Sequence, residues 1–197
     1  DQFQYSFISE KFPGLVNYDM SKIKVAYIDI ETSSENGFPD VRSATEEVLA
    51  VSIKMGKDFR VYGCGSYDPQ PGVKYISCVD EKNLLLEFVN DWMMNYPDVI
   101  TGWNSRFFDI PYMVNRIRNV LGEKIANKLS PWGWFRESEV TLVGNRKQQV
   151  FDLVGISSID YMDAYKKFTY VNQERYSLNH IAYVELGEKK LDYSEYA

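Results

Sequence analysis

Two carboxylates separated by one apolar residue, Asp29 and Glu31, lie at the end of an apolar and β-branched segment, residues 24–30. This segment predicts a β-strand, and residues two apart in a strand point to the same face. Adjacent carboxylates repel each other and raise each other's pKa unless a cation lies between them. The pair therefore predicts either a solvated strand end or a site for a divalent cation such as Mg²⁺ or Mn²⁺.

A third carboxylate, Asp109, begins a segment with helical periodicity and precedes Pro111 by two residues. Asn104 stands shortly before it in a Gly-Trp-Asn turn. Asp is favoured in the first turn of any helix by the unpaired backbone N–H groups and by the helix dipole. Asn is a common turn residue for its own reasons. From the residues alone, a purely structural role stays open for both.

The chain contains one His and two Cys, Cys64 and Cys78. This set is too small for a disulfide framework, and a cytoplasmic location is the default expectation. It also argues against a zinc site built from soft ligands, so any metal would be held by carboxylates. The sequence shows neither a signal peptide nor an apolar run long enough to span a membrane, and we expect no membrane partner.

The net charge of −6 argues against a protein that coats nucleic acid through charge alone. The charge is uneven, however, with a net of −7 over residues 1–100 and +1 over residues 101–197. A DNA-binding surface should therefore draw on the second half. Its candidate basic residues are Arg116, Arg118, Lys124, Lys128, Arg146, Lys147, Lys166 and Lys167.

The remaining pattern predicts the elements that position these groups. Strands are expected at residues 24–30, 48–55, 59–62, 74–79, 98–101 and 158–162, and a β-hairpin at 139–155 turns at Gly144-Asn145. Helices are expected at residues 81–94, 109–120, 123–129, 164–168 and 177–185, the last with Ser177 as N-cap. Strands followed by alternating helices and strands indicate one α/β domain with a mixed sheet.

The order of these features resembles a known family. Asp-Ile-Glu on a strand, then Gly-Trp-Asn and Phe-Asp-Ile-Pro-Tyr before a helix, resemble the first two exonuclease motifs of family B DNA polymerases. Further stretches, listed here, resemble the T-even phage type over nearly the whole chain: residues 22–31, Gly37-Phe38-Pro39, residues 101–112, the hairpin at Gly144, residues 160–168 and Tyr176-Ser177-Leu178. The resemblance implies a ribonuclease-H-like fold, with a mixed β-sheet flanked by helices and an inserted β-hairpin.

The resemblance also implies a domain division and an incomplete site. Residues 1–23 would be an extension from the preceding domain boundary, and residues 24–197 the exonuclease domain, cut before the third family motif. That motif is Tyr-x-x-x-Asp, and no Tyr in this sequence is followed four residues later by Asp. The fourth carboxylate and the Tyr would then be missing, so we expect the fragment to be weak or inactive.

The implied activity is proofreading: 3′→5′ hydrolysis of the terminal phosphodiester of single-stranded or frayed DNA, with release of deoxynucleoside monophosphates. Two divalent ions, Mg²⁺ or Mn²⁺, would be held by carboxylates. By this resemblance, Asp29 would bridge both ions, Glu31 would ligate the ion that activates the attacking water, and Asp109 would ligate the other ion.

The same resemblance names DNA contacts. Phe38 would stack on a terminal base and Asn104 would contact the frayed strand, with Phe108, Arg146 and Lys190 as further DNA-binding residues. A Phe38 buried in the core, and a merely exposed Lys190, are the competing interpretations. The implied partners are primer–template DNA and the remaining polymerase domains, and a sliding clamp is a further candidate through the parent chain.

Two other pairs of residues could be mistaken for metal ligands, and neither is assigned to the metal site. His180 with Glu185 imitates the His-x(4)-Asp variant of related exonucleases, but Glu replaces Asp and the flanking pattern fits a structural helix. Asp160 and Asp163 lie beside a strand end, where the resemblance gives no metal role. Two alternatives to the proofreading enzyme remain: a non-catalytic single-strand-binding module, and a stand-alone exonuclease acting on RNA or short oligonucleotides.

Overall fold

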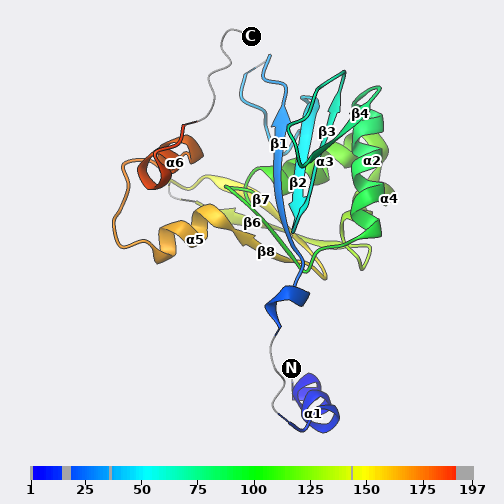
Figure 1. The fold of residues 1–197 in the computed structure, drawn as a ribbon, viewed down its shortest axis with the longest axis vertical. Coiled ribbons are helices and arrows are strands. Elements are labelled where there is room, and N and C mark those ends of the chain that lie inside the picture. The colour runs from blue at the N-terminus through cyan, green and yellow to red at the C-terminus, as the bar shows by residue number, and fades with distance from the viewer. Residues whose placement is uncertain (1, 15–18, 36, 143, 190–197) are drawn as a thin grey trace.

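The protein is described by a computed structural model over residues 2–14, 19–35, 37–142 and 144–189. In this part of the chain six strands form one sheet in the order β4-β3-β2-β1-β5-β8. Figure 1 shows β1, β2, β3 and β4 of this sheet side by side. β2 is antiparallel to β1 and β3, whereas the pairs β1–β5, β5–β8 and β3–β4 are parallel. The strands are β1 Val25–Thr32, β2 Val48–Met55, β3 Asp58–Cys64, β4 Val73–Cys78, β5 Val99–Gly102 and β8 Ser157–Asp160. The predicted α/β class with a mixed sheet is confirmed.

β1 has the two faces that its alternating sequence predicts. Ile28 and Ile30 are buried, whereas Tyr27, Asp29 and Glu31 are exposed on the opposite face. The prediction that Asp29 and Glu31 share a face away from Ile30 is therefore confirmed.

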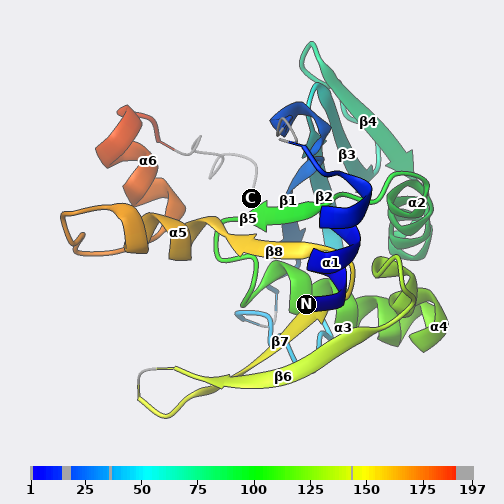
Figure 2. The same cartoon turned by 90° about the horizontal axis from the view of Figure 1, so that it is seen from below.

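The buried face of β1 packs into one core with two helices, α2 Glu81–Met94 and α3 Asp109–Leu121. Asp80 caps α2, because its Oδ1 accepts a hydrogen bond of 2.7 Å from the backbone N–H of Asn83. Burying each large apolar side chain of this core contributes roughly 1.5–3 kcal/mol. Figure 2 shows α2 beside β3 and β4, and α3 beside the hairpin. α4 Glu123–Ala126 and the 3₁₀ helix η2 Asn127–Leu129 continue from α3.

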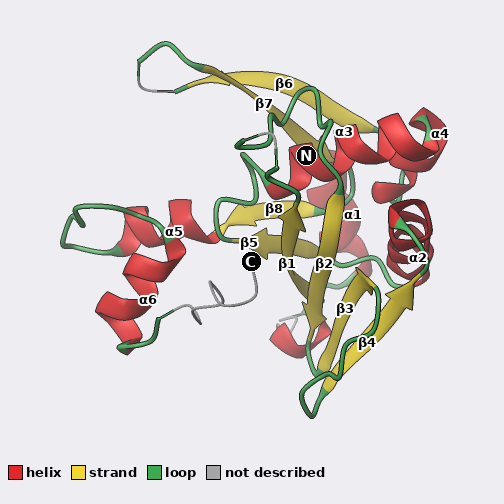
Figure 3. Cartoon of the chain, turned by 90° about the horizontal axis from the view of Figure 1, so that it is seen from above, coloured by secondary structure: helices red, strands yellow, loops and turns green. Residues whose placement is uncertain are grey.

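The hairpin consists of β6 Phe135–Thr141 and β7 Lys147–Leu153, paired antiparallel. Gly144 and Asn145 have φ angles of +85° and +58°, the left-handed conformation that a tight turn requires. Figure 3 shows the hairpin on the α3 side of the sheet, and α5 with α6 together on another side. The predicted inserted hairpin is confirmed, although β6 begins earlier than expected.

Several boundaries differ from the predictions. α1 Gln2–Lys11 was not expected, because its apolar residues do not fall on one helix face, and Phe3 and Tyr5 are exposed. η1 Met20–Lys22 was likewise not predicted. β8 ends at Asp160 rather than at residue 162, because Asp160 caps the helix that follows, α5 Tyr161–Phe168. Ser177 takes the expected N-cap position of α6 Leu178–Leu186.

Cys64 and Cys78 are free thiols, and burial is the main cause that raises the pKa of each. Within the described residues, every helix is too short or too polar to cross a membrane.

Candidate functional site

Asp109, the first residue of α3, is 3% exposed and reaches across to the sheet. Its Oδ1 accepts a hydrogen bond of 3.0 Å from the backbone N–H of Ile30, the residue between Asp29 and Glu31. The bond ties the start of α3 to β1. Asp109 therefore does more than favour its own helix end, and it lies next to the first carboxylate pair.

The charge state of Asp109 depends on this surrounding. Burial, the largest cause, and the negative charge of Asp29 together raise the pKa of Asp109 to about 7, although the hydrogen bond from the Ile30 N–H lowers it. A cation placed between Asp29 and Asp109 would relieve their repulsion and return Asp109 to its charged form. All-oxygen carboxylate donors suit a hard divalent ion, so the chemistry of these two groups fits Mg²⁺ or Mn²⁺.

The third predicted ligand, Glu31, is exposed on the same face of β1 as Asp29. Over residues 2–14, 19–35, 37–142 and 144–189, no group of three or more His, Cys, Asp or Glu side chains is arranged to hold a metal ion. The structure thus brings Asp29 and Asp109 together, and the complete carboxylate centre stays a prediction.

The Gly-Trp-Asn turn joins β5 to this site. A Cβ atom at Gly102 would lie 2.5 Å from the carbonyl oxygen of Ile28 and 2.9 Å from Cβ of Ser105, so only glycine fits this close approach of β5 and β1. Asn104 follows with a left-handed φ of +63°. Its predicted turn role is therefore confirmed, and its contact with DNA stays a prediction.

Asp160 holds that turn from the neighbouring strand β8. It is 5% exposed, and its two carboxylate oxygens accept the backbone N–H groups of Asn104 at 3.1 Å and Arg106 at 2.9 Å. Oδ1 also accepts the N–H of Met162 at 2.9 Å. These bonds give Asp160 a structural role in holding the turn.

A cleft of about 610 Å³ has Phe108, the residue directly before Asp109, in its lining. Its walls come from the loop after β1, the Gly-Trp-Asn turn, the β6–β7 hairpin and α5. The predicted DNA contacts that line it are Phe38, Asn104, Phe108 and Arg146. Lys190 lies outside the described residues. The structure therefore gathers in one cleft residues that are more than 100 positions apart in the sequence.

Phe38 is the most exposed aromatic side chain of this cleft, with 87% of its surface accessible. The competing interpretation of a core phenylalanine is therefore wrong. Its ring centroid lies 5.7 Å from that of Phe108, whose ring stacks on Tyr112 at 5.6 Å. Because Tyr112 is fully buried, the three rings form a row from the core to the solvent.

The basic lining of the cleft includes a residue that the sequence did not indicate, Arg42. It forms an ion pair with Glu139 of β6, which also contacts Lys147 with an Nζ–Oε2 distance of 3.4 Å. Lys166 of α5 lines the same cleft. The only available sequence cue for Arg42 was its place four residues after Phe38 in one loop.

Two of the basic residues assigned to a DNA surface have other partners. Arg116 is 12% exposed and pairs with Glu81 of α2. Arg118 pairs with Glu123, and its guanidinium carbon lies 4.8 Å from the centre of the Phe135 ring. Both serve packing between elements, so the expectation of a DNA role for them is corrected.

The His180 and Glu185 pair lies on α6. Glu185 accepts a hydrogen bond from the Tyr165 hydroxyl, which links α6 to α5. This contact agrees with the structural interpretation of that helix.

A mixed sheet of this order, flanked by helices, is that of a ribonuclease-H-like α/β domain. The sequence model of one family, described as "DNA polymerase family B, exonuclease domain", matches residues 5–181, and the chain belongs to this family.

Similar proteins include the DNA-directed DNA polymerases of two phages. The chain is 34% identical to that of Escherichia phage RB69 and 29% identical to that of Enterobacteria phage T4. Each alignment covers 98% of this chain and 24% of the phage protein, so the chain spans about a quarter of their length. The DNA polymerase delta catalytic subunit of Mesocricetus auratus is 26% identical over 88% of this chain and 16% of its own. The resemblance to the T-even phage type is confirmed.

Proposed function

We propose that the chain is the proofreading 3′→5′ exonuclease module of a replicative, phage-type DNA polymerase. It hydrolyses the 3′-terminal phosphodiester of single-stranded or frayed DNA and releases deoxynucleoside monophosphates. The observation that carries the proposal is the position of Phe38, exposed over a cleft that Asn104, Phe108 and Arg146 also line, with Phe108 directly before Asp109 in the chain.

Asp29, Glu31 and Asp109 would hold two divalent ions. When bound, such ions lower the pKa of water and neutralise charge on the phosphate and on the departing 3′ oxygen. The chain's own contribution is to fix the donors. The Ile30 N–H orients Asp109, and the pleat of β1 places Asp29 and Glu31 on one face.

Recognition of the DNA end follows from the cleft. A frayed 3′ base would stack on Phe38, which is worth about 1–3 kcal/mol per base and tolerates any sequence. This tolerance suits an editing enzyme, because a mispaired end frays more readily than a paired one. Asn104, Phe108, Arg146 and Lys190 would contact the strand that enters the cleft.

The longer parent protein would supply the other polymerase domains and the missing Tyr-x-x-x-Asp motif. We propose that residues 24–197 are the exonuclease domain of a longer polymerase chain in the cytoplasm of the host cell, with residues 1–23 as the extension toward the preceding domain. The other polymerase domains, primer–template DNA and a sliding clamp are the proposed partners. Because the 197 residues hold no Tyr-x-x-x-Asp motif, they should cut weakly by themselves.

A second candidate is a single-strand-binding module without catalysis. The observation in its favour is that the described residues do not form a three-ligand metal group. Both candidates share the cleft, and they differ in whether divalent ions lead to hydrolysis.

Both candidates require the cleft to bind single-stranded DNA. This binding is tested by fluorescence anisotropy with the 197-residue chain in Ca²⁺, which limits cleavage. A labelled single strand and a 3′-tailed duplex should bind about tenfold more tightly than a blunt duplex, the equivalent of about 1.4 kcal/mol. Equal binding of the blunt duplex would contradict both candidates.

A further inference from the structure

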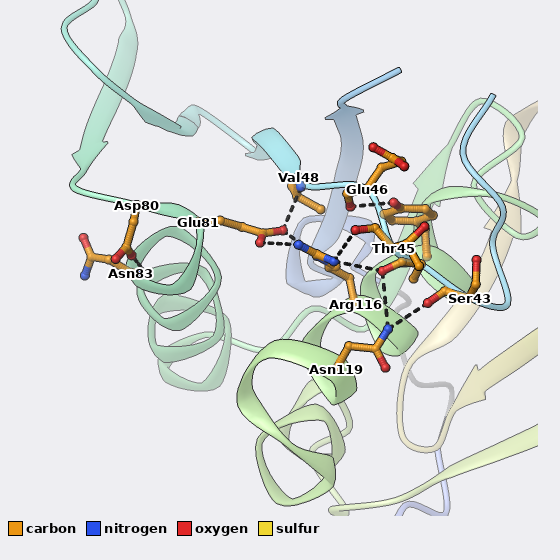
Figure 4. Close-up of polar contacts among 11 residues, drawn as sticks. Ser43, Thr45, Glu46, Val48, Asp80, Glu81, Asn83, Arg116 and Asn119 are labelled. Carbon is orange, nitrogen blue, oxygen red and sulfur yellow. Dashed lines mark hydrogen bonds and ion pairs between the residues drawn. The ribbon is translucent and has the colours of Figure 1, made fainter. Parts of the chain in front are cut away.

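Arg116 is a nearly buried cation that the proposed function leaves without a role. From the middle of α3 its Nε and Nη2 atoms donate to Oε1 and Oε2 of Glu81, at 2.7 Å and 2.6 Å (Figure 4). Its Nη1 donates to the carbonyl oxygens of Ala44 at 3.0 Å and Thr45 at 2.7 Å. One guanidinium therefore joins α2, α3 and the loop between β1 and β2.

Neighbouring side chains of α3 hold the same loop. Asn119 Nδ2 donates to the carbonyl of Ser43 at 2.8 Å (Figure 4), and Asn115 Nδ2 donates to that of Val41 at 2.9 Å. The Tyr112 hydroxyl donates to the carbonyl of Glu46 at 2.6 Å. Because side chains three or four residues apart share a helix face, these groups form one row of donors along α3.

The loop needs this support. Ala44 has a φ of +41° and is fully buried, and a non-glycine residue in the left-handed region costs on the order of 1–2 kcal/mol. The Ala44 carbonyl accepts from both Arg116 and Asn119. The opposite end of the loop is also fixed, because Glu81 accepts the backbone N–H of Val48 at 2.8 Å.

The held segment carries the cleft aromatic. Phe38 lies three residues before Val41, whose carbonyl is bonded to Asn115, and the intervening Pro39 is buried. Displacing residues 41–46 would therefore move Phe38 relative to Phe108, which belongs to α3's N-terminal end and would stay in place.

We propose that Arg116, with Glu81, is a positioning residue for Phe38: by holding the carbonyls of the β1–β2 loop it keeps the aromatic side chain over the cleft. Arg116 acts through the loop and lies outside the group of residues that would touch DNA. A buried ion pair is seldom needed for stability alone, since apolar replacements are often as stable. The inference rests on the proposed function, in which Phe38 stacks on the terminal base.

The test uses the 197-residue chain and a single strand with 2-aminopurine, a fluorescent base, as its 3′-terminal nucleotide, in EDTA. Arg116→Lys keeps the charge but loses the fork that bonds Glu81 and two carbonyls at once. We expect it to reduce the emission change on binding by about twofold or more, while Phe38→Ala abolishes that change. A strand with 2-aminopurine at its 5′ end reports effects unrelated to the 3′ base.

The matched control is Arg60→Lys. Arg60 Nη1 bonds Asp91 at 2.9 Å and thus links β3 to α2, without contacting the β1–β2 loop. The Arg60→Lys variant should lower the thermal midpoint about as much as Arg116→Lys does, and it should leave the emission change of the 3′-terminal 2-aminopurine unaltered. Asn119→Ala gives a second variant at an exposed position, which removes bonds to the Ser43 and Ala44 carbonyls without leaving a buried charge. It should reduce the emission change in the same direction.

Unaltered emission in both Arg116→Lys and Asn119→Ala, alongside a lost signal in Phe38→Ala, would overturn the positioning role and leave the proposed function standing. An equal loss in Arg60→Lys would also overturn it, because general destabilisation would then explain the effect. If Phe38→Ala changes nothing, the stacking part of the proposed function fails, and the inference fails with it.

Discussion

Asp109 Oδ1 lies 3.0 Å from the backbone nitrogen of Ile30 and accepts its hydrogen across a separation of 79 residues. The contact joins the strand that carries Asp29 to the helix that begins with Asp109. Since burial and Asp29 together raise the pKa of Asp109 to about 7, protons and divalent cations should compete at this point of the fold.

In metal-free buffer, Asp109→Asn should stabilise the protein at pH 8. The folded-state pKa of about 7 lies above the unfolded value of 3.8. The folded protein therefore binds more protons between these values, and this stabilisation is complete below the lower one and lost as pH rises through the higher one. Urea unfolding with EDTA should show a gain of roughly 1–3 kcal/mol for the variant at pH 8 and little at pH 4. If the free energy of unfolding depends on pH in the same way in the original protein and in Asp109→Asn, the raised pKa of Asp109 would be refuted.

Divalent ions should raise the thermal midpoint more at pH 8 than at pH 6, because ligand carboxylates must be ionised. The measurement is a melting curve with and without Mn²⁺ at each pH. Asp29→Asn should remove most of the shift, whereas Asp152→Asn, an exposed Asp of β7, should leave it unchanged. A shift that survives in Asp29→Asn would place the ion elsewhere.

Gly102→Ala should destabilise the protein by roughly 1–3 kcal/mol, because the added Cβ would meet the backbone carbonyl of Ile28 at 2.5 Å. Gly63→Ala is the matched change in β3, where the Cβ would meet the hydroxyl end of the Tyr75 side chain at 2.9 Å. A side chain can move aside more easily than backbone, so Gly63→Ala should reduce the free energy of unfolding less than Gly102→Ala. Equal losses in urea unfolding would argue against the close approach of β5 and β1.

Arg146→Ala should weaken single-strand binding equally for all sequences and reduce the dependence of affinity on salt. Each phosphate contact contributes about 0.7 to the slope of log affinity against log salt for a single strand. Lys82→Ala, at an exposed basic residue of α2 outside the cleft, is the control. An unchanged slope in Arg146→Ala would remove this residue from the proposed DNA path.

Much of this architecture could be predicted from local pattern. The apolar alternation of β1 placed Asp29 and Glu31 on one face, and the helical periodicity of α2 and α3 gave their extents closely. The hairpin followed from a Gly-Asn turn, whose left-handed φ angles the structure shows.

What could not be predicted depends on long-range partners. Arg116 was assigned to a DNA surface because its charge is visible in the sequence, whereas its pairing with Glu81, 35 residues away, is not. The structural task of Asp160 arises from N–H groups that the Gly-Trp-Asn turn brings to it from more than 50 residues away. α1 lacks a single apolar face, so its sequence carried no helical periodicity to detect.

The central claim is metal-dependent hydrolysis from the 3′ end by the Asp29, Glu31 and Asp109 carboxylates. The most direct measurement follows a 5′-labelled single strand with Mg²⁺ or Mn²⁺, comparing the 197-residue chain, a longer polymerase chain that contains it together with a Tyr-x-x-x-Asp motif, and Asp29→Ala in the longer form. We predict stepwise shortening from the 3′ end by the longer chain, little by the 197 residues, and none by the variant. Shortening that persists in Asp29→Ala, or a longer chain that binds the strand without cutting it, would contradict the account.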